Sequence, residues 1–191
     1  MKLSKPKLFV FSAPSGSGKT TIVKDVLNTF PNFVFSISAT TRKKRQSEKN
    51  GVDYFFISET EFKEKIEKNE FVEWEKFYDY YYGTLKSQIE ENISKGLNTV
   101  FEVDVKGALS IKKYYPDAVL IFIAPPSIEE LKQRLIKRNT ETEEDLKKRI
   151  ERAEMELSFK DKFDYEVSNS DLEIAKKKVR EIIEKEIKEE I

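Results

Sequence analysis

The sequence contains neither cysteine nor histidine among its 191 residues. The absence of cysteine excludes a disulfide framework, thiolate catalysis and cysteine metal sites, and the absence of histidine excludes imidazole bases and imidazole ligands. An excess of charge is also missing, because 35 lysines and arginines balance 35 aspartates and glutamates. The net charge therefore gives no indication of a nucleic-acid or membrane partner, and any ligand must be identified from local sites.

Long hydrophobic runs are absent as well. The first apolar run, 8–11, is far shorter than a signal peptide or a membrane span. We therefore expect a cytoplasmic protein with no membrane, nucleic-acid or obligatory protein partner. The length predicts a single domain that buries a substantial core.

A loop of small residues stands out after this apolar run, and an amphipathic pattern follows it at 21–27. A buried strand, a glycine-rich loop and a helix opening at Gly-Lys-Thr are the context in which backbone N–H groups cradle phosphates. In such a loop Lys19 reaches the β- and γ-phosphates, and the Thr20 hydroxyl is offered to Mg²⁺. The predicted ATP-binding loop is Ala13, Pro14, Ser15, Gly16, Ser17, Gly18, Lys19 and Thr20.

Strand-like and helix-like patterns alternate along the rest of the chain, which predicts an α/β fold with a parallel sheet covered on both faces. Residues 36–85 are expected to form an inserted β-rich lobe. Thr84 and Asp171 are predicted helix N-caps, and Ser58 and Ser127 open predicted capping boxes. The predicted strands are 33–38, 54–57, 71–77, 99–103, 119–123 and 165–168, and the predicted helices end near 68, 95, 113, 138, 159 and 190.

Arginine is scarce, since only seven of the 35 basic residues are arginines, and six of these fall into two groups. A guanidinium binds phosphate through two parallel hydrogen bonds, whereas lysine suffices for solubility. One group for each of two phosphate-bearing substrates is the simplest hypothesis. The alternative, charges on a solvated helix face, is favoured for Arg152. The groups are Arg42 and Arg45 in a polar loop, and Arg134, Arg138, Arg149 and Arg152 in a later helical region.

Three carboxylates lie at informative positions. Glu73 could accept hydrogen bonds from N1–H and N2–H of guanine, although strand spacing alone favours a solvent-facing residue. Glu102 and Asp104 end a core strand at the carboxyl edge where ligands of open α/β sheets bind, and their spacing puts both on one strand face. One of them is predicted to hold Mg²⁺, directly or through water.

Six ordered blocks resemble the guanylate kinase family of P-loop nucleoside monophosphate kinases over nearly the whole chain. The blocks are Ser-Ala-Pro-Ser-Gly-Ser-Gly-Lys-Thr at 12–20, Thr-Thr-Arg-x-x-Arg-x-x-Glu-x-x-Gly-x-x-Tyr-x-Phe at 40–56, Phe-Val-Glu-Trp at 71–74, Tyr-Tyr-Gly-Thr at 81–84, Glu-Val-Asp-Val-x-Gly-Ala at 102–108 and Ile-Ala-Pro-Pro-Ser at 123–127.

The resemblance implies a three-layer P-loop NTPase fold in one domain. It divides the chain into a core (1–35, 86–133 and 160–191), a GMP-binding lobe (36–85) and a helical lid (134–159). It implies transfer of the γ-phosphoryl group of Mg·ATP to GMP, with Mg²⁺ held by Thr20 and by Glu102, directly or through water.

The resemblance also implies roles for single residues. Arg42, Arg45, Tyr54 and Tyr82 would hold the GMP phosphate, Ser38, Glu73, Thr84 and Asp104 would contact guanine, and Glu48 would orient the arginine loop. Lys19, Arg42, Arg134, Arg138 and Arg149 would be catalytic, and Asn169 would lie near adenine.

Two other functions stay open at this point. Guanylate-kinase-like domains also serve as peptide-binding scaffolds, but these have typically lost the phosphate loop that this chain retains. A kinase for another nucleotide or a small phosphate ester is the second alternative.

Overall fold

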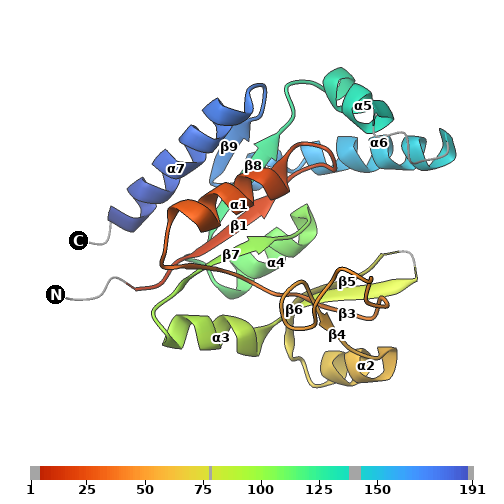
Figure 1. Ribbon diagram of the computed structural model, residues 1–191, viewed down its shortest axis with the longest axis vertical. Coiled ribbons are helices and arrows are strands. Elements are labelled where there is room, and N and C mark those ends of the chain that lie inside the picture. Colours follow the sequence, from red (N-terminus) through yellow and green to blue (C-terminus); the bar gives the residue numbers. More distant parts are fainter. Residues whose placement is uncertain (1–4, 78, 138–142, 189–191) are drawn as a thin grey trace.

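The computed structural model describes residues 5–77, 79–137 and 143–188, which form two β-sheets flanked by helices. Figure 1 shows the larger sheet in the upper part of the molecule and the smaller sheet below it. In this part of the chain no helix is long and apolar enough to cross a bilayer.

The larger sheet has five parallel strands in the order β2–β7–β1–β8–β9. Parallel strands that are covered on both faces bury every side chain, and all residues of β1 and β8 are buried accordingly. The parallel sheet predicted from the alternating patterns is confirmed. The strands are β1 (Leu8–Ser12), β2 (Phe33–Phe35), β7 (Asn98–Glu102), β8 (Val119–Ala124) and β9 (Tyr165–Ser168).

Helices cover both faces of this sheet, so the core has three layers. Because successive side chains of a strand point to opposite faces, Phe9 and Phe11 join one apolar cluster with α1 and α7. Leu8 and Val10 join a second cluster with α3 and α4. The helices are α1 (Lys19–Thr29), α3 (Lys86–Ser94), α4 (Val105–Tyr114) and α7 (Leu172–Lys188).

The smaller sheet is inserted between β2 and α3, and its strands run in the order β4–β3–β6–β5. Phe62 of α2 is buried against it and stacks on Phe71 with ring centroids 4.3 Å apart. The predicted cap at Ser58 is confirmed, because its hydroxyl accepts a hydrogen bond from the Glu61 N–H. The elements are β3 (Ala39–Thr40), β4 (Phe55–Phe56), α2 (Glu59–Glu67), β5 (Phe71–Phe77) and β6 (Tyr80–Leu85).

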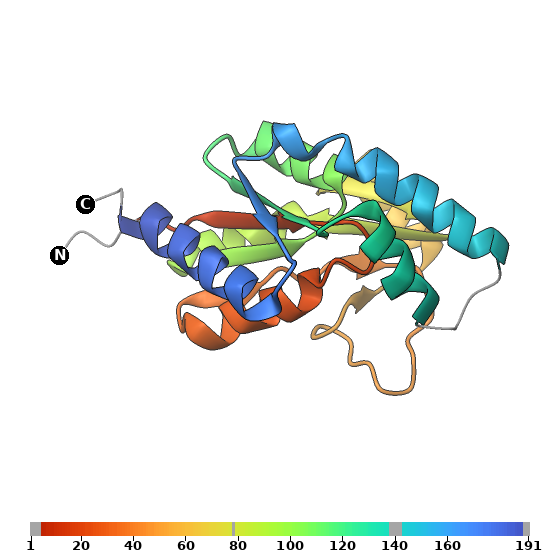
Figure 2. The same ribbon diagram turned by 90° about the horizontal axis from the view of Figure 1, so that it is seen from above.

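Two helices after β8 form the remaining part, α5 (Ile128–Lys137) and α6 (Glu143–Leu157), followed by the short 3₁₀ helix η1 (Lys160–Lys162). They share a buried apolar cluster of Leu131, Leu135 and Ala153. Figure 2 shows α5 and α6 at the end of the molecule opposite α7. The smaller sheet and the α5–α6 pair thus lie on either side of the carboxyl ends of the core strands (Figure 1).

Several local predictions are wrong. Thr84 does not cap α3, because β6 continues through it to Leu85, which precedes the helix without a side-chain cap. The strand predicted over 33–38 ends at Phe35, and Ala39 and Thr40 pair with β6 in the other sheet. The helix predicted near 108–113 is longer, because α4 already begins at 105.

Candidate active site

The loop between β1 and α1 has a backbone that only glycine accommodates at two positions. Gly16 and Gly18 have φ angles of 91° and 88°, in the left-handed region. A Cβ atom on Gly18 would also collide with the side-chain amide of Asn169, which donates a 2.7 Å hydrogen bond to the Ser17 carbonyl oxygen. Gly18 gives α1 no side-chain cap, so the first N–H groups of the helix are free of a side-chain acceptor. This is the arrangement that binds an anion at a helix N-terminus.

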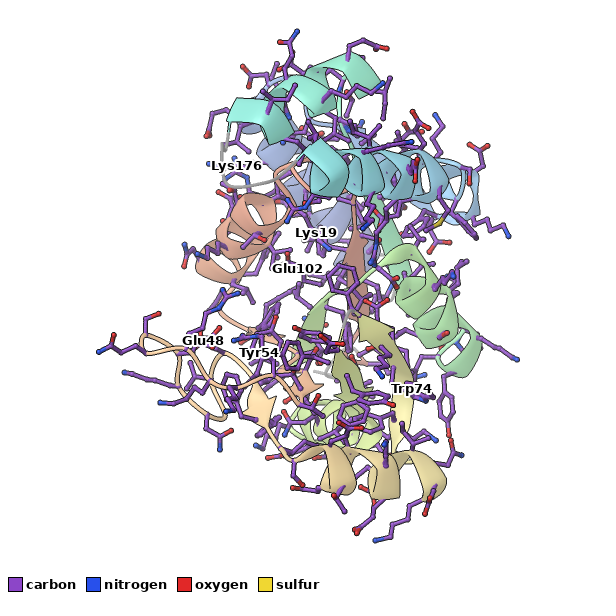
Figure 3. All side chains as sticks on the ribbon, turned by 90° about the vertical axis from the view of Figure 1, so that its right-hand side faces the viewer. Lys19, Glu48, Tyr54, Trp74, Glu102 and Lys176 are labelled. Carbon is purple, nitrogen blue, oxygen red and sulfur yellow. The ribbon has the colours of Figure 1, made fainter. Side chains whose placement is uncertain are left out.

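Lys19 and Thr20 lie directly after this loop and face the end of β7. The Lys19 ammonium donates to the Val103 carbonyl oxygen at 3.1 Å, and the Thr20 hydroxyl donates to Oε1 of Glu102 at 2.6 Å. Burial lowers the pKa of Lys19, an effect that the Glu102 carboxylate opposes. Figure 3 shows Lys19 and Glu102 close together in the middle of the molecule. A cation and a hydroxyl thus stand beside a carboxylate at the mouth of the loop.

The polar segment between β3 and β4 is organised by Glu48. Its carboxylate accepts hydrogen bonds of 3.1 and 2.6 Å from the two terminal nitrogens of Arg42, and one of 2.7 Å from the Arg45 backbone N–H. The hydrogen bond to Arg42 lowers the pKa of Glu48. The Arg42 guanidinium carbon lies 5.6 Å from the ring centroid of Tyr54, which contacts Tyr82 edge-on. The segment therefore holds one arginine in a fixed, stacked orientation.

Glu73 is not the solvent-facing residue that strand spacing favours. The side chain is partly buried, and its Oε1 accepts a 2.5 Å hydrogen bond from the Thr84 hydroxyl on the neighbouring strand β6. Burial raises the pKa of Glu73 to about 7, the Thr84 hydrogen bond lowers it, and the Asp104 carboxylate adds to the rise. Because this pKa lies near neutral pH, the charge of Glu73 changes when a hydrogen-bond donor or another charged group approaches it.

Asp104 does not share a strand face with Glu102, because β7 ends at Glu102. Asp104 is instead the N-cap of α4, and its Oδ1 accepts a 2.8 Å hydrogen bond from the Gly107 N–H. The i, i+2 argument does not apply because β7 ends at Glu102 and Asp104 caps the helix that follows. Both carboxylates still line the same cleft.

This cleft, of about 910 Å³, brings most of the predicted site residues together. All eight residues predicted for the phosphate loop line it. They are joined there by Ser38, Glu48, Tyr54, Glu73, Tyr82, Glu102, Asp104 and Arg149.

The other predicted residues lie behind this surface or away from it. Thr84 and Arg42 do not line the cleft, and they donate hydrogen bonds to Glu73 and Glu48, respectively. Arg134 donates to Glu130 at 3.3 Å and to the Asn169 carbonyl oxygen at 3.2 Å. The side chain of Arg45 is exposed, and the predicted Arg138 lies outside the described residues.

Comparison with known proteins agrees with this geometry. A family model described as guanylate kinase matches residues 5–186. The chain is 49% identical to the guanylate kinase of Thermotoga maritima over 95% of its own length and 88% of that protein, and 51% identical to that of Bacteroides fragilis over 95% and 90%. The chain belongs to the guanylate kinase family.

A solved structure extends this likeness to the fold. The crystal structure of guanylate kinase from Anaplasma phagocytophilum superimposes with a TM-score of 0.75 at 30% identity, covering 97% of this chain and 88% of that one. The α/β fold with a parallel core sheet is therefore that of a guanylate kinase.

Sequence reasoning missed one arginine of this guanylate kinase. Arg152 of α6 is not a solvated helix-face charge: it lines the cleft and forms ion pairs with Glu156 on α6, with Asp104 and with Glu75 on β5. Only the i, i+4 pair with Glu156 is visible in the sequence, and that spacing is typical of an exposed helix pair. The contacts with Asp104 and Glu75 join residues far apart in the chain, so no local pattern could have indicated them.

The oxygen atoms near the loop fit a hard divalent cation. The Thr20 hydroxyl and the Glu102 carboxylate lie 2.6 Å apart, and Mg²⁺ typically binds one or two such groups and keeps several waters. No group of three or more histidine, cysteine, aspartate or glutamate side chains placed to hold a metal ion is found in the described ranges.

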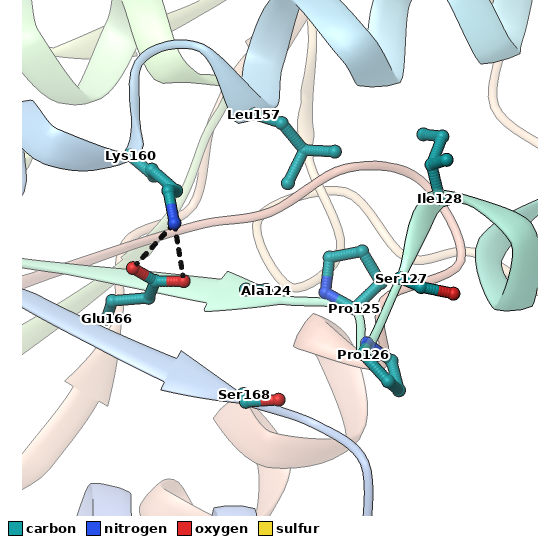
Figure 4. A pocket seen from close by; sticks show the side chains of 9 residues that line it. All are labelled: Ala124, Pro125, Pro126, Ser127, Ile128, Leu157, Lys160, Glu166 and Ser168. Carbon is teal, nitrogen blue, oxygen red and sulfur yellow. Dashed lines mark hydrogen bonds and ion pairs between the residues drawn. The ribbon is translucent and has the colours of Figure 1, made fainter.

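A second, smaller cavity of about 360 Å³ lies where β8 and β9 end (Figure 4). Its polar side chains include Lys160 and Glu166, which pair with each other at 3.2 Å. None of the predicted site residues lines it. The larger cleft, where the predicted residues gather, is therefore the candidate active site.

Proposed function

We propose that this protein transfers the γ-phosphoryl group of ATP to GMP and releases ADP and GDP. The observation that carries the proposal is that one cleft joins the phosphate loop on the core to the Glu73 and Glu48 positions on the smaller sheet. Phosphoryl transfer between two nucleotides requires both phosphate chains to meet in one enclosure.

The donor side is the loop 13–20 together with the start of α1. Its backbone N–H groups and the helix dipole would hold the phosphates of ATP, and Lys19 would exchange its bond to the Val103 carbonyl for the phosphate oxygens. Asn169 supports this side by holding the Ser17 carbonyl oxygen, and its expected place near adenine is part of the proposal.

The acceptor side is the smaller sheet, which we propose as the GMP-binding lobe. Arg42, oriented by Glu48, would bind the GMP phosphate with Arg45, Tyr54 and Tyr82. Glu73 would accept two N–H groups of guanine, and Ser38, Thr84 and Asp104 would complete the base site. A base without those two donors would leave acceptor positions of the Glu73 carboxylate unfilled beside its hydrogen bond from Thr84, which costs on the order of 1–3 kcal/mol.

Mg²⁺ would be held by Thr20 and Glu102, directly or through water, and when bound it supplies positive charge to the phosphate oxygens. The protein itself needs no general base, because the attacking GMP phosphate oxygen is already anionic at neutral pH. Its own contribution is positive charge and positioning. We propose that Lys19, Arg42, Arg134, Arg138 and Arg149 supply this charge, with α5 and α6 acting as a lid.

Positioning in a cleft that closes also keeps water away from the phosphoryl group, which limits the hydrolysis of ATP. The division into core, lobe and lid is part of this proposal. The expected cytoplasmic location and the absence of an obligatory protein partner stay predictions.

An assay of ADP release with Mg·ATP and each of GMP, AMP, UMP and dTMP tests the function. We expect saturable, GMP-dependent ADP release, with much lower rates for the other three acceptors. A higher rate with another monophosphate would assign a different substrate. The absence of ADP release with every acceptor would favour a binding module and overturn the proposal.

A further inference from the structure

Arg152 contacts acidic groups from three separate elements at the wall of the cleft. Its Nε donates to Oε1 of Glu156 at 3.1 Å, and its Nη2 lies 3.3 Å from Oδ2 of Asp104 and 3.6 Å from Oε2 of Glu75. The guanidinium carbon also lies 4.6 Å from the ring centroid of Phe77. One side chain of α6 thus contacts the N-terminus of α4 and the strand β5 of the smaller sheet.

These contacts hold Asp104 from both sides. Its Oδ1 accepts the Gly107 N–H of the α4 cap, and its Oδ2 faces Arg152, so both oxygens of the carboxylate have a fixed partner. A carboxylate held by a backbone donor and a guanidinium has one preferred orientation. Asp104 is only 15% exposed in its side chain, which leaves little room for other orientations.

Arg152 also balances negative charge at this wall. Glu75, Asp104 and Glu156 lie together there, and Glu73 lies close enough for the charges of Asp104 and Glu75 to raise its pKa. Without the guanidinium these carboxylates would repel one another and would also repel an incoming nucleotide phosphate. A lysine would supply the charge but could not hold the carboxylates in the same geometry, because its ammonium lacks the planar fork that reaches Glu156 on one side and Asp104 on the other.

We propose that Arg152 is a positioning residue for the acceptor nucleotide. Arg152 acts through its ion pairs with Asp104 and Glu75. The pair with Asp104 orients a carboxylate of the base site, and the pair with Glu75 holds β5 against α6. The proposal rests on the function proposed above. The ion pairs of Arg152 with Asp104 and Glu75 lie on the acceptor side, and its charge lowers the pKa of Lys19 less than burial does, so its removal should affect GMP more than ATP.

The experiment compares Arg152→Gln with Arg180→Gln. The control is closely matched, because Arg180 pairs with Asp25 at 3.3 Å with side chains 32% and 18% exposed, and the Arg152–Asp104 pair has the same distance with 31% and 15% exposure. Arg180 joins α7 to α1 and does not line the cleft. A purely structural role would lower the melting temperature in both variants without separating the two substrates.

We expect Arg152→Gln to raise the KM for GMP by about fivefold or more, and the KM for ATP to stay within about twofold of wild type. Calorimetric titration of GMP in the absence of ATP should show the same loss of affinity. Arg180→Gln should change neither KM. Arg152→Lys should restore only part of the GMP affinity, because it restores the charge without the fork.

A double-mutant cycle with Glu75→Gln tests the route of the effect. Because the contribution of Glu75 depends on its ion pair with Arg152, which Arg152→Gln already removes, the double variant should bind GMP no more weakly than Arg152→Gln alone. An unchanged or lower KM for GMP in Arg152→Gln, or equal changes for GMP and ATP, would overturn the inference while the wild type still turns over. A wild-type protein without GMP-dependent ADP release would instead overturn the proposed function.

Discussion

Replacing Glu73 by glutamine separates its role in substrate recognition from its effect on stability. The substitution keeps the shape of the side chain and removes the charge. The amide oxygen of glutamine can still accept the hydrogen bond that the Thr84 hydroxyl donates to Oε1 at 2.5 Å. Only the carboxylate can accept from two N–H groups of guanine at once, because one end of the amide is itself a donor.

The stability change follows from the pKa of Glu73, which burial raises from 4.5 to about 7. The folded state binds this proton more tightly than the unfolded state, so wild-type stability falls as the pH rises from about 4.5 through about 7. A difference of this size corresponds to about 3 kcal/mol between the ends of that range. Glutamine does not titrate, and Glu73→Gln should therefore be more stable than wild type at pH 8 by up to this amount, and similar to it at pH 4.

GMP binding changes in the opposite direction to stability, because Glu73→Gln should weaken it. An unpaired donor in a buried base site costs on the order of 1–3 kcal/mol, which corresponds to a rise in the KM for GMP of about 5- to 150-fold. The KM for ATP should be unaffected, because Glu73 is on the acceptor side. Wild-type GMP affinity should also weaken below about pH 7, as Glu73 becomes protonated, by more than in the variant.

Urea unfolding at pH 4 and pH 8 measures the first effect, and steady-state kinetics with GMP and ATP measures the second. Glu64→Gln, an exposed position on α2 of the same lobe, is the control. A GMP KM equal to that of wild type would remove Glu73 from the base site. If Glu73→Gln is less stable than wild type at pH 8, the argument that ionised Glu73 destabilises the folded protein is refuted.

Two further substitutions test the phosphate sites. Lys19→Met should abolish turnover. It should leave the circular dichroism spectrum unchanged, since burial already disfavours the charge of the Lys19 ammonium and lowers its pKa. Lys95→Met, at an exposed ion pair, is the control, and wild-type activity of the Lys19 variant would exclude the loop from catalysis. Glu48→Gln weakens the charge-assisted bonds that hold Arg42 and the Arg45 backbone, so we expect the KM for GMP to rise about tenfold. An unchanged GMP KM would mean that the orientation of Arg42 is not required.

The parts of this fold that the sequence predicts are those with local signals. The phosphate loop is defined by a strand, two glycines and a helix start that are contiguous in the chain. The caps at Ser58, Ser127 and Asp171 are likewise defined by residues within one turn, and their hydrogen bonds are present. Such features need no knowledge of distant partners.

The features that failed depend on partners that are distant in the sequence. Threonine is a residue type that favours N-cap positions. Pairing with β5 instead extends β6 through Thr84, and the Thr84 hydroxyl donates a hydrogen bond to Glu73. The sequence around Arg152 indicates only an i, i+4 pair with Glu156 on a helix surface. The fold also brings Asp104, 48 residues away in the chain, to the other side of the guanidinium. Tertiary pairing decides these positions, and local propensity does not.

The central claim is that one cleft holds two nucleotides with their phosphates facing each other. The most direct measurement is calorimetric titration with a bisubstrate compound in which adenosine and guanosine are joined through five phosphates. The account predicts one molecule bound per chain, more tightly than either ATP or GMP, and loss of binding for both nucleotides once it is bound. Displacement of only one nucleotide, or binding of two molecules per chain, would contradict it.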